Sequence, residues 1–225
     1  MIPLRDTIRS RTTPVVNYTL ITISIAIFLF QLTLGEPAYG RLLQNFAVIP
    51  GDLHATLLSG RFSLQPMFSL VSSLFLHGGW AHLLGNMLYL YVFGDNVEDR
   101  LGHLPYLLFY LVAGSLAALI ETIVQGPADV PLIGASGAIA GILGAYFILF
   151  PKARVLTLLP LFIVFPVIEV SAWFFLGFWL VLQFIQGGLS LGTEGGGIAW
   201  WAHAGGFLAG AGMLPFFLLA RRLKS

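Results

Sequence analysis

The chain has 225 residues, of which 57% are hydrophobic and only 9% are charged, and its mean hydropathy is +0.89. This composition argues against a soluble domain and indicates a polytopic membrane protein. The absence of cysteine excludes disulfides, thiolate metal sites and cysteine nucleophiles, while the net charge of +1 indicates no particular partner.

Six apolar segments are candidates to cross a bilayer, whose hydrocarbon core is about 30 Å thick. The first follows three arginines, and its length of about 20 apolar residues exceeds the core of a cleaved signal peptide, so we interpret it as a span. The second begins at Phe68 or Leu74. We therefore expect an all-α, single-domain, six-helix membrane bundle over residues 1–225, with spans at about 15–34, 68–94, 104–124, 136–151, 169–186 and 200–220.

The connections between the spans differ in character. Residues 35–66 mix apolar and charged side chains, which suits either a segment lying in the membrane interface or a small extramembrane hairpin. Residues 155–166 are apolar but contain two prolines, so we interpret them as an interfacial connection. Residues 187–197 form a glycine-rich loop.

The basic residues indicate an orientation. Six spans put both termini on one side, and a cytoplasmic N-terminus leaves only Arg41 and Arg61 outside. This is a strong positive-inside bias. The residues collected on the cytoplasmic side are Arg5, Arg9, Arg11, Arg100, Lys152, Arg154, Arg221, Arg222 and Lys224.

Counting from these charges places polar residues of three spans at one depth. Ser136 lies 16 residues from Lys152, and His82 and His203 each lie 18 residues from the arginine that follows their span. Asn86 lies one turn closer to the arginine than His82, and at about 1.5 Å per residue these rises fall between roughly 21 and 27 Å. Polar groups at such a depth usually face the interior of the bundle and mark a functional site.

A serine and a histidine at one depth make a plausible nucleophile and general base. Ser136 and His203 are therefore the candidate catalytic residues. The carboxylates of Glu121 and Asp129 lie nearer the outer surface, which favours a dyad over a triad. Each residue alone has a structural alternative, because a serine in a span often bonds a carbonyl and a histidine often joins helices.

The second span adds candidate donors. His82 and Asn86 are four residues apart and share a helix face. Together with the Ser136 backbone N–H, they are groups that can hold an oxyanion. A purely structural role for His82 remains an alternative, and we expect His77 to position the loop. A metal site is disfavoured because there is no HExxH motif and no carboxylate at this depth.

Small residues permit the helices to meet. Gly206 and Gly210 form a small-xxx-small pair close to His203. Gly134 and Gly137 flank the candidate nucleophile, and we expect all four glycines to serve packing at the site.

The combined motifs resemble the rhomboid family of intramembrane serine proteases. The resemblance covers essentially the whole chain and rests on three motifs in order, residues 77–86 (HGGWAHLLGN), 134–137 (GASG) and 202–206 (AHAGG) with Gly210. It implies a six-helix rhomboid-like fold and hydrolysis of peptide bonds in or near transmembrane segments of single-span or polytopic membrane proteins. By this match, Ser136 is the nucleophile, His203 the base, and His82, Asn86 and the Ser136 amide line the oxyanion hole.

The resemblance also implies that substrates enter sideways between the second and fifth spans and are cut after a small residue, with Phe175, Phe178 and Trp179 of the fifth span forming part of a gate. Two features depart from it: Ala140 replaces an aromatic residue on which the histidine packs in some members, and the tryptophan–arginine pair of the first external loop is missing. We expect no cofactor and no nucleic-acid partner. The location expected is a prokaryotic cytoplasmic membrane, with both termini cytoplasmic and the active site toward the outer side.

Two other functions are alternatives. One is a catalytically inactive, rhomboid-like protein that binds membrane clients, although both Ser136 and His203 are present. The other is a small transporter, which would be favoured by inverted repeats or broken helices in matching halves, and the sequence shows no sign of either.

Overall fold

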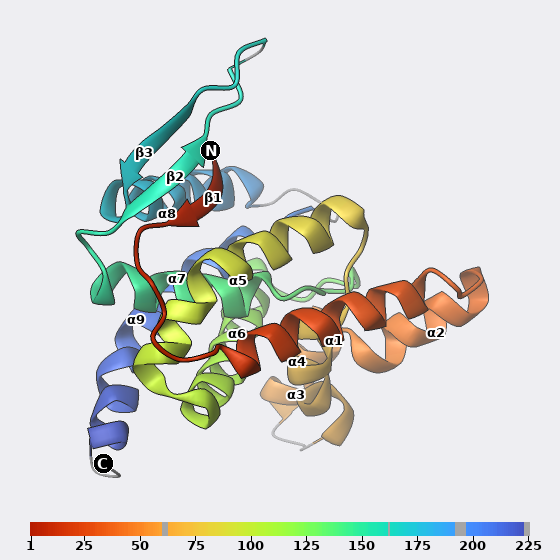
Figure 1. The fold of residues 1–225 in the computed structure, drawn as a ribbon. Helices are drawn as coiled ribbons and strands as arrows, with labels where there is room; N and C mark the ends of the chain where they lie inside the picture. The colour runs from red at the N-terminus through yellow and green to blue at the C-terminus, as the bar shows by residue number, and fades with distance from the viewer. Residues whose placement is uncertain (60–62, 162, 192–196, 223–225) are drawn as a thin grey trace.

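The computed structural model describes residues 1–59, 63–161, 163–191 and 197–222. For residues 220–222 it describes the backbone alone. Arg61, residues 192–196 of the glycine-rich loop, Lys224 and the side chains of Arg221 and Arg222 lie outside this description. Within it, the chain is a mostly helical bundle with one small sheet (Figure 1). The helices are α1 (Val15–Gln31), α2 (Glu36–Phe46), α3 (Pro50–Ser59), α4 (Leu64–Ser72), the 3₁₀ turn η1 (Ser73–Phe75), α5 (Trp80–Leu101), α6 (His103–Gln125), α7 (Ser136–Leu149), α8 (Ala172–Ser190) and α9 (Trp200–Arg222).

The helices α6, α8 and α9 are each long and apolar enough to cross a membrane. A fourth crossing is possible if α4 with η1 and α5 count as one span, although they are bent by 83° at their junction. The helices α1 and α7 are apolar but have only 17 and 14 residues. The expected helical membrane bundle is confirmed. By helix length and apolar composition, however, the described residues provide three or four membrane spans and not six.

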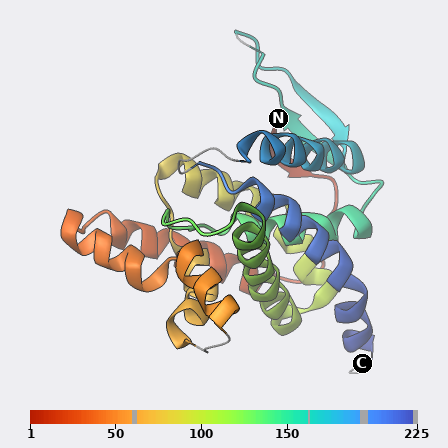
Figure 2. The same cartoon turned by 180° about the vertical axis from the view of Figure 1, so that it is seen from behind.

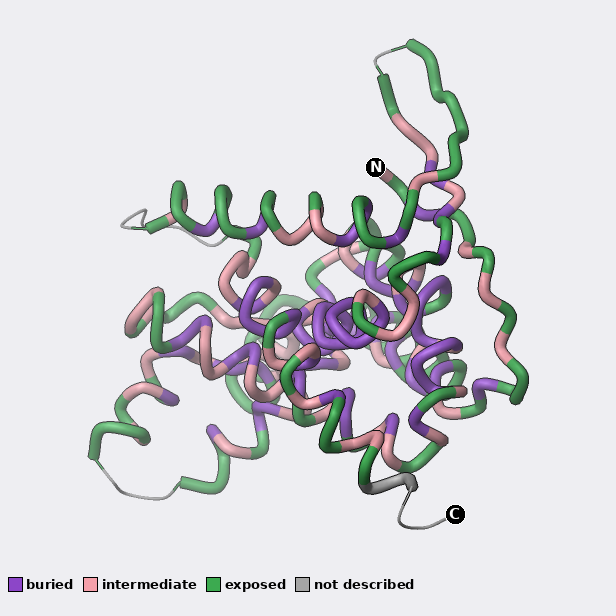
Figure 3. Tube along the Cα trace, turned by 90° about the vertical axis from the view of Figure 1, so that its left-hand side faces the viewer, coloured by how far each residue is buried: buried purple, intermediate pink, exposed green. Residues whose placement is uncertain are grey.

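Helix α7 lies at the centre of the bundle. It packs on α5, α6, α8 and α9, and Figures 1 and 2 show it between α5 on one side and α6 and α9 on the other. Ten consecutive residues, Gly137–Tyr146, are buried. In Figure 3, which colours the chain by burial, the buried segments gather in the middle of the bundle and much of α8 is exposed.

The second predicted span is interrupted, which corrects the expectation of one helix over 68–94. Gln31 of α1 holds the junction: its side chain accepts from the His77 backbone N–H at 3.1 Å and donates to the His77 carbonyl at 3.1 Å. These bonds replace those that a continuous helix would make. After the break, α5 continues to Leu101 and carries within the helix the segment 95–100, four of whose residues are charged.

One of these charged residues, Glu98, caps the start of α1 with its side chain. Its side chain is 0% exposed and accepts from the backbone N–H groups of Val16 at 3.0 Å and Asn17 at 2.7 Å. It also lies 2.5 Å from Nδ1 of His103, with which it is paired. The carboxylate satisfies N–H groups that every helix leaves free at its start, and it thereby joins α1 to α5.

A three-stranded antiparallel sheet, with the order β1-β2-β3, was not expected in an all-α protein. Its strands are β1 (Ile2–Asp6), β2 (Arg154–Leu158) and β3 (Val167–Ser171). Strand β2 therefore takes up the beginning of the predicted interfacial connection, and β3 takes up the start of the predicted fifth span. Figure 1 shows their hairpin projecting beside α8.

The stretch between α1 and α4 is also structured. Residues 35–66 contain α2 and α3 and the first turn of α4. The helix α2 has no buried residue, and its neighbour α3 buries Pro50 and Leu53. An isolated bridge between Val48 and Leu132 ties this stretch to the loop that leads into α7.

Candidate active site

A cavity of about 840 Å³ opens among α5, α7, α8 and α9 and the loops that precede α5, α7 and α9. Four residues that the sequence singles out, Ser136, His203, His82 and Asn86, line it. Most of the remaining lining is apolar. A few convergent polar groups in a mostly apolar cavity are typical of a ligand or active site.

Ser136 is the first residue of α7. The helical bonds begin with Ile139, whose backbone N–H donates to the Ala135 carbonyl at 2.9 Å. The N–H groups of Ser136, Gly137 and Ala138 therefore have no acceptor within the helix, and they lie at its positive end. Because Ser136 also lines the cavity, this helix end can receive developing negative charge there.

Gly134 shapes the approach to Ser136. Its φ is +119°, and a Cβ built on it would lie 2.5 Å from Nε2 of His82. Its backbone N–H donates to the Ser73 carbonyl at 2.9 Å. A side chain at this position would be strained by its φ and would strike the ring, so the glycine lets the loop before α7 pack directly on His82.

Glycines also bring α7 against α9. A Cβ on Gly206 would lie 2.3 Å from the Gly137 carbonyl oxygen, and one on Gly210 would lie 2.1 Å from the Gly141 carbonyl oxygen. The two helices therefore touch backbone to backbone. The candidate nucleophile and the candidate base each lie within one turn of this contact, which fixes the two helix starts relative to each other.

The ring of His203 is held by α8. Its Nδ1 lies 2.8 Å from Oε1 of Gln183, and the ring of Trp179 lies 5.9 Å away, centroid to centroid, at an interplanar angle of 32°. The ring of Trp200, in α9 itself, stands edge-on at 6.2 Å. Position 140 on α7 holds an alanine and not an aromatic residue, and α8, the fifth predicted span, supplies the aromatic packing for His203 instead.

Glu121 holds the first turn of α9. Its side chain is 7% exposed, and Oε2 accepts from the backbone N–H of Ala202 at 2.6 Å. The sequence analysis gave neither Glu121 nor Gln183 a part in the site. Both are polar residues inside apolar helices, and the rule that such groups must have partners is the signal that points to them.

Asn86 presents an unused donor. The residue is 8% exposed, and its Nδ2 has no hydrogen-bond partner among the described residues. A buried N–H without a partner is costly, and it usually has a functional reason. Since Asn86 lines the cavity, its amide is available to a ligand oxygen.

His82 lies in the first turn of α5, and its ring centroid is 5.2 Å from that of His77. His77 is 1% exposed, does not line the cavity, and its backbone is bound by Gln31. The structure therefore gives His77 the loop-positioning place that the sequence suggested, and puts His82 between it and the cavity.

The three residues expected at a gate point in different directions. Phe175 is 1% exposed and packs against Phe93 and Tyr89 of α5, so it lies buried in the contact between α5 and α8. Phe178 is 43% exposed and stacks on Phe174 along the outside of α8. Trp179 lines the cavity. In the described part of the chain, no group of three or more His, Asp or Glu side chains could hold a metal ion.

Comparison with known proteins gives consistent matches. Residues 65–220 match the family model described as Rhomboid domain. The protein named Rhomboid protein 1, mitochondrial, from Saccharomyces cerevisiae is 32% identical over 198 residues, which cover 86% of this chain and 50% of the yeast protein. The putative rhomboid protease YdcA of Bacillus subtilis is 39% identical over 77 residues (34% of this chain, 38% of YdcA). Rhomboid protease GlpG of Haemophilus influenzae is 31% identical over 78 residues (35% of this chain, 39% of GlpG). The chain thus spans about half the length of the yeast relative, and the matches to the two bacterial proteins cover less than that of each.

Proposed function

The chain belongs to the rhomboid family, and on this premise we propose that it is an intramembrane serine endopeptidase. Its substrates are other membrane proteins, single-span or polytopic, cut in or next to a transmembrane segment. Relatives named as proteases support a hydrolase. The observation that carries the proposal is that a serine, two histidines and an unsatisfied asparagine amide line one cavity.

Ser136 and His203 perform the chemistry. The Ser136 Oγ attacks the carbonyl carbon of the scissile peptide, and its proton passes to Nε2 of His203. The tetrahedral intermediate collapses as the C–N bond breaks, and the leaving amine takes that proton from His203. A water molecule then attacks the acyl ester, again losing a proton to His203, and the carboxylic acid product leaves with Ser136 restored.

The oxyanion of each tetrahedral intermediate is held by donors already in place. The Ser136 backbone N–H lies at the positive end of α7, and the amide of Asn86 is free to donate. His82 supplies a third donor from the same helix as Asn86. Donors that are oriented before the reaction stabilise charge without reorganising, which is commonly a large part of catalysis.

We also propose that the whole chain is one rhomboid-like domain with six membrane segments. The helices α1 and α7 serve as the two short ones, at roughly 26 and 21 Å for about 1.5 Å per residue. Helix α7 need not reach both membrane faces, because it begins in the cavity. This assignment requires the bent pair of α4 with η1 and α5 to serve as a single segment.

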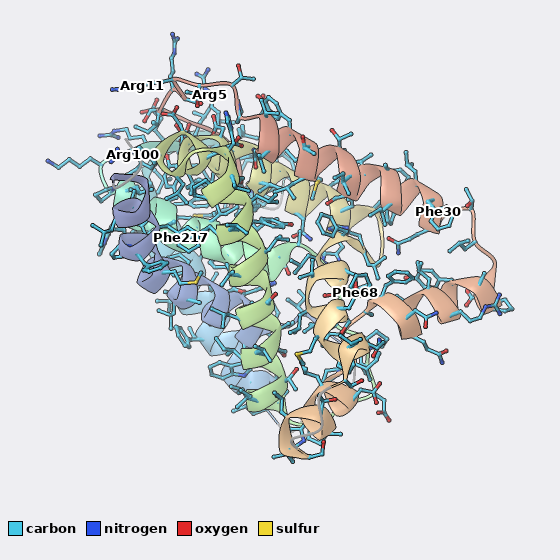
Figure 4. The ribbon with its side chains drawn as sticks, turned by 90° about the horizontal axis from the view of Figure 1, so that it is seen from below. Arg5, Arg11, Phe30, Phe68, Arg100 and Phe217 are labelled. Carbon is cyan, nitrogen blue, oxygen red and sulfur yellow. The ribbon has the colours of Figure 1, made fainter. Side chains whose placement is uncertain are left out.

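In this arrangement the termini lie on the side that carries most arginines. Figure 4 supports it, because Arg5, Arg11 and Arg100 lie at one end of the molecule and Phe30 lies at the far end of α1. The site then opens toward the opposite side. The expectation of a prokaryotic cytoplasmic membrane gains no support from the relatives, which include the mitochondrial yeast protein as well as bacterial proteins.

The test is cleavage of a panel of single-span substrates by purified protein in liposomes. Wild type is compared with Ser136→Ala and with Ser24→Ala, which removes a buried hydroxyl on α1 outside the cavity. We expect cleavage by wild type and by Ser24→Ala and none by Ser136→Ala. Cleavage that persists in Ser136→Ala would refute the nucleophile. Failure of wild type across a broad panel would favour the client-binding alternative.

A further inference from the structure

We propose that Gln183 of α8 is the positioning residue for His203, so that the base is oriented for catalysis only while α8 is seated against α9. This inference rests on the proposed function and deepens it. It assigns to an amide the place that a carboxylate holds in a catalytic triad.

The first step is that the Gln183 side chain is buried and fully used. It is 4% exposed within a mostly apolar helix, where a buried amide without partners would be costly. Its Nε2 donates to the Trp179 carbonyl at 3.0 Å, and its Oε1 lies 2.8 Å from Nδ1 of His203. Both ends of the amide are therefore engaged.

The second step is that these bonds set the state of the imidazole. A carbonyl oxygen can only accept, so the Trp179 carbonyl requires the NH₂ of Gln183 and turns the amide oxygen toward His203. The amide oxygen also only accepts, which requires the proton on Nδ1. The neutral ring then has its lone pair on Nε2, the nitrogen that must take the Ser136 proton.

The third step is that α8 also fixes the plane of the ring. Trp179 lies one turn before Gln183, and its indole packs against the imidazole at 5.9 Å. One helix thus supplies the contact to the ring face and the partner of Nδ1. The buried Ala140 on α7 is too small to replace either.

The last step concerns the helix itself. Of the residues in the apolar segment of α8, 28% are buried inside the protein, compared with 44% for α6 and 39% for α9. The helix α8 is therefore the least buried of the three long spans. It packs mainly on α9, with fewer contacts to α7. Movement of α8 away from α9 would remove both contacts from His203 at once. The orientation of His203 therefore depends on α8 staying packed against α9.

The experiment compares Gln183→Leu, Gln183→Glu and a matched control, Gln186→Leu, with wild type in liposomes. Gln186 is on the same helix three residues later and is exposed. We expect Gln183→Leu to lower kcat by roughly 10- to 100-fold, with KM within about 2-fold, because the Nδ1 donor is left buried without an acceptor. Gln183→Glu keeps an acceptor oxygen and should restore kcat to within a few-fold of wild type. The control should match wild type.

Two further measurements separate orientation from folding. Thermal unfolding checks that Gln183→Leu is as well folded as the control. Nitrogen NMR of labelled His203 in detergent reports the tautomer, which should be Nδ1–H in wild type and mixed in Gln183→Leu. If this variant has wild-type kcat, if only its KM changes, or if Gln183→Glu is no better, Gln183 merely ties α8 to α9 and the inference is wrong. In each case cleavage by wild type that Ser136→Ala abolishes leaves the proposed function standing.

Discussion

Substituting Gly210 by alanine tests whether the site depends on the contact between α7 and α9. The added Cβ would lie 2.1 Å from the Gly141 carbonyl oxygen and 2.5 Å from the Gly141 Cα, about 1.3 Å short of the 3.4 Å at which ordinary contact begins. Both obstacles are backbone atoms, so no side chain can swing aside. The helices must separate, and overpacking of this kind costs about 1–3 kcal/mol of folding free energy.

The activity should fall further than this stability loss alone explains. Gly210 does not line the cavity, but a shift of about 1 Å between catalytic groups can lower the rate by roughly 100-fold. We therefore expect Gly210→Ala to keep its fold at a lower unfolding temperature and to lose about two orders of magnitude in kcat. The matched control is Gly212→Ala, on the same helix, where a Cβ meets nothing within 4 Å.

The assay measures kcat and the unfolding midpoint of the three proteins in one detergent. Alanine favours a helix over glycine by up to about 1 kcal/mol, so Gly212→Ala should be as stable as wild type or more so. Wild-type kcat in Gly210→Ala would refute the argument that close packing of α7 and α9 sets the geometry of Ser136 and His203. An equal loss in both variants would refute it as well.

Two further predictions concern single polar groups. Asn86→Ala should lower kcat by roughly 10²- to 10³-fold with little change in the unfolding midpoint, since it removes an oxyanion donor; unchanged turnover would leave Asn86 a packing residue. Asp6, in β1 outside the membrane segments, accepts from Tyr146 and from Asn96, yet burial raises its pKa. The stability that its protonated form contributes is complete below the unfolded-state pKa and is lost as pH rises through the higher folded-state pKa. Asp6→Asn cannot ionise, so it should remove this part of the pH dependence of the unfolding midpoint, and an identical profile in the variant would contradict the assignment.

The sequence predicts the helices of this fold better than their interruptions and the sheet. Apolar runs of membrane length mark α6, α8 and α9 directly. The break before α5 depends on Gln31, 46 residues upstream of His77, whose side chain takes over backbone bonds there. The strand β1 pairs with β2 about 150 residues later, and no local pattern announces such a distant partner.

For the site, sequence motifs and depth single out Ser136, His203, His82 and Asn86, and the structure places all four at one cavity. The rotation of α8 is what the sequence does not give. Lipid and protein core are both apolar, so hydrophobicity alone leaves open which face of a membrane helix turns inward. This is why the sequence alone does not predict that Phe175 is buried against α5 or that Gln183 meets His203.

The burial of α7 has a consequence for how the protein responds to its bilayer. A helix that touches lipid must tilt, or deform the membrane, when the hydrophobic thickness does not match its length. Ten successive residues of α7 are covered by neighbouring helices, so a thicker or thinner membrane acts on the surrounding helices first. The depth of Ser136 below the surface is then set by protein packing, and acyl-chain length should alter access to the cavity before it alters the position of the serine.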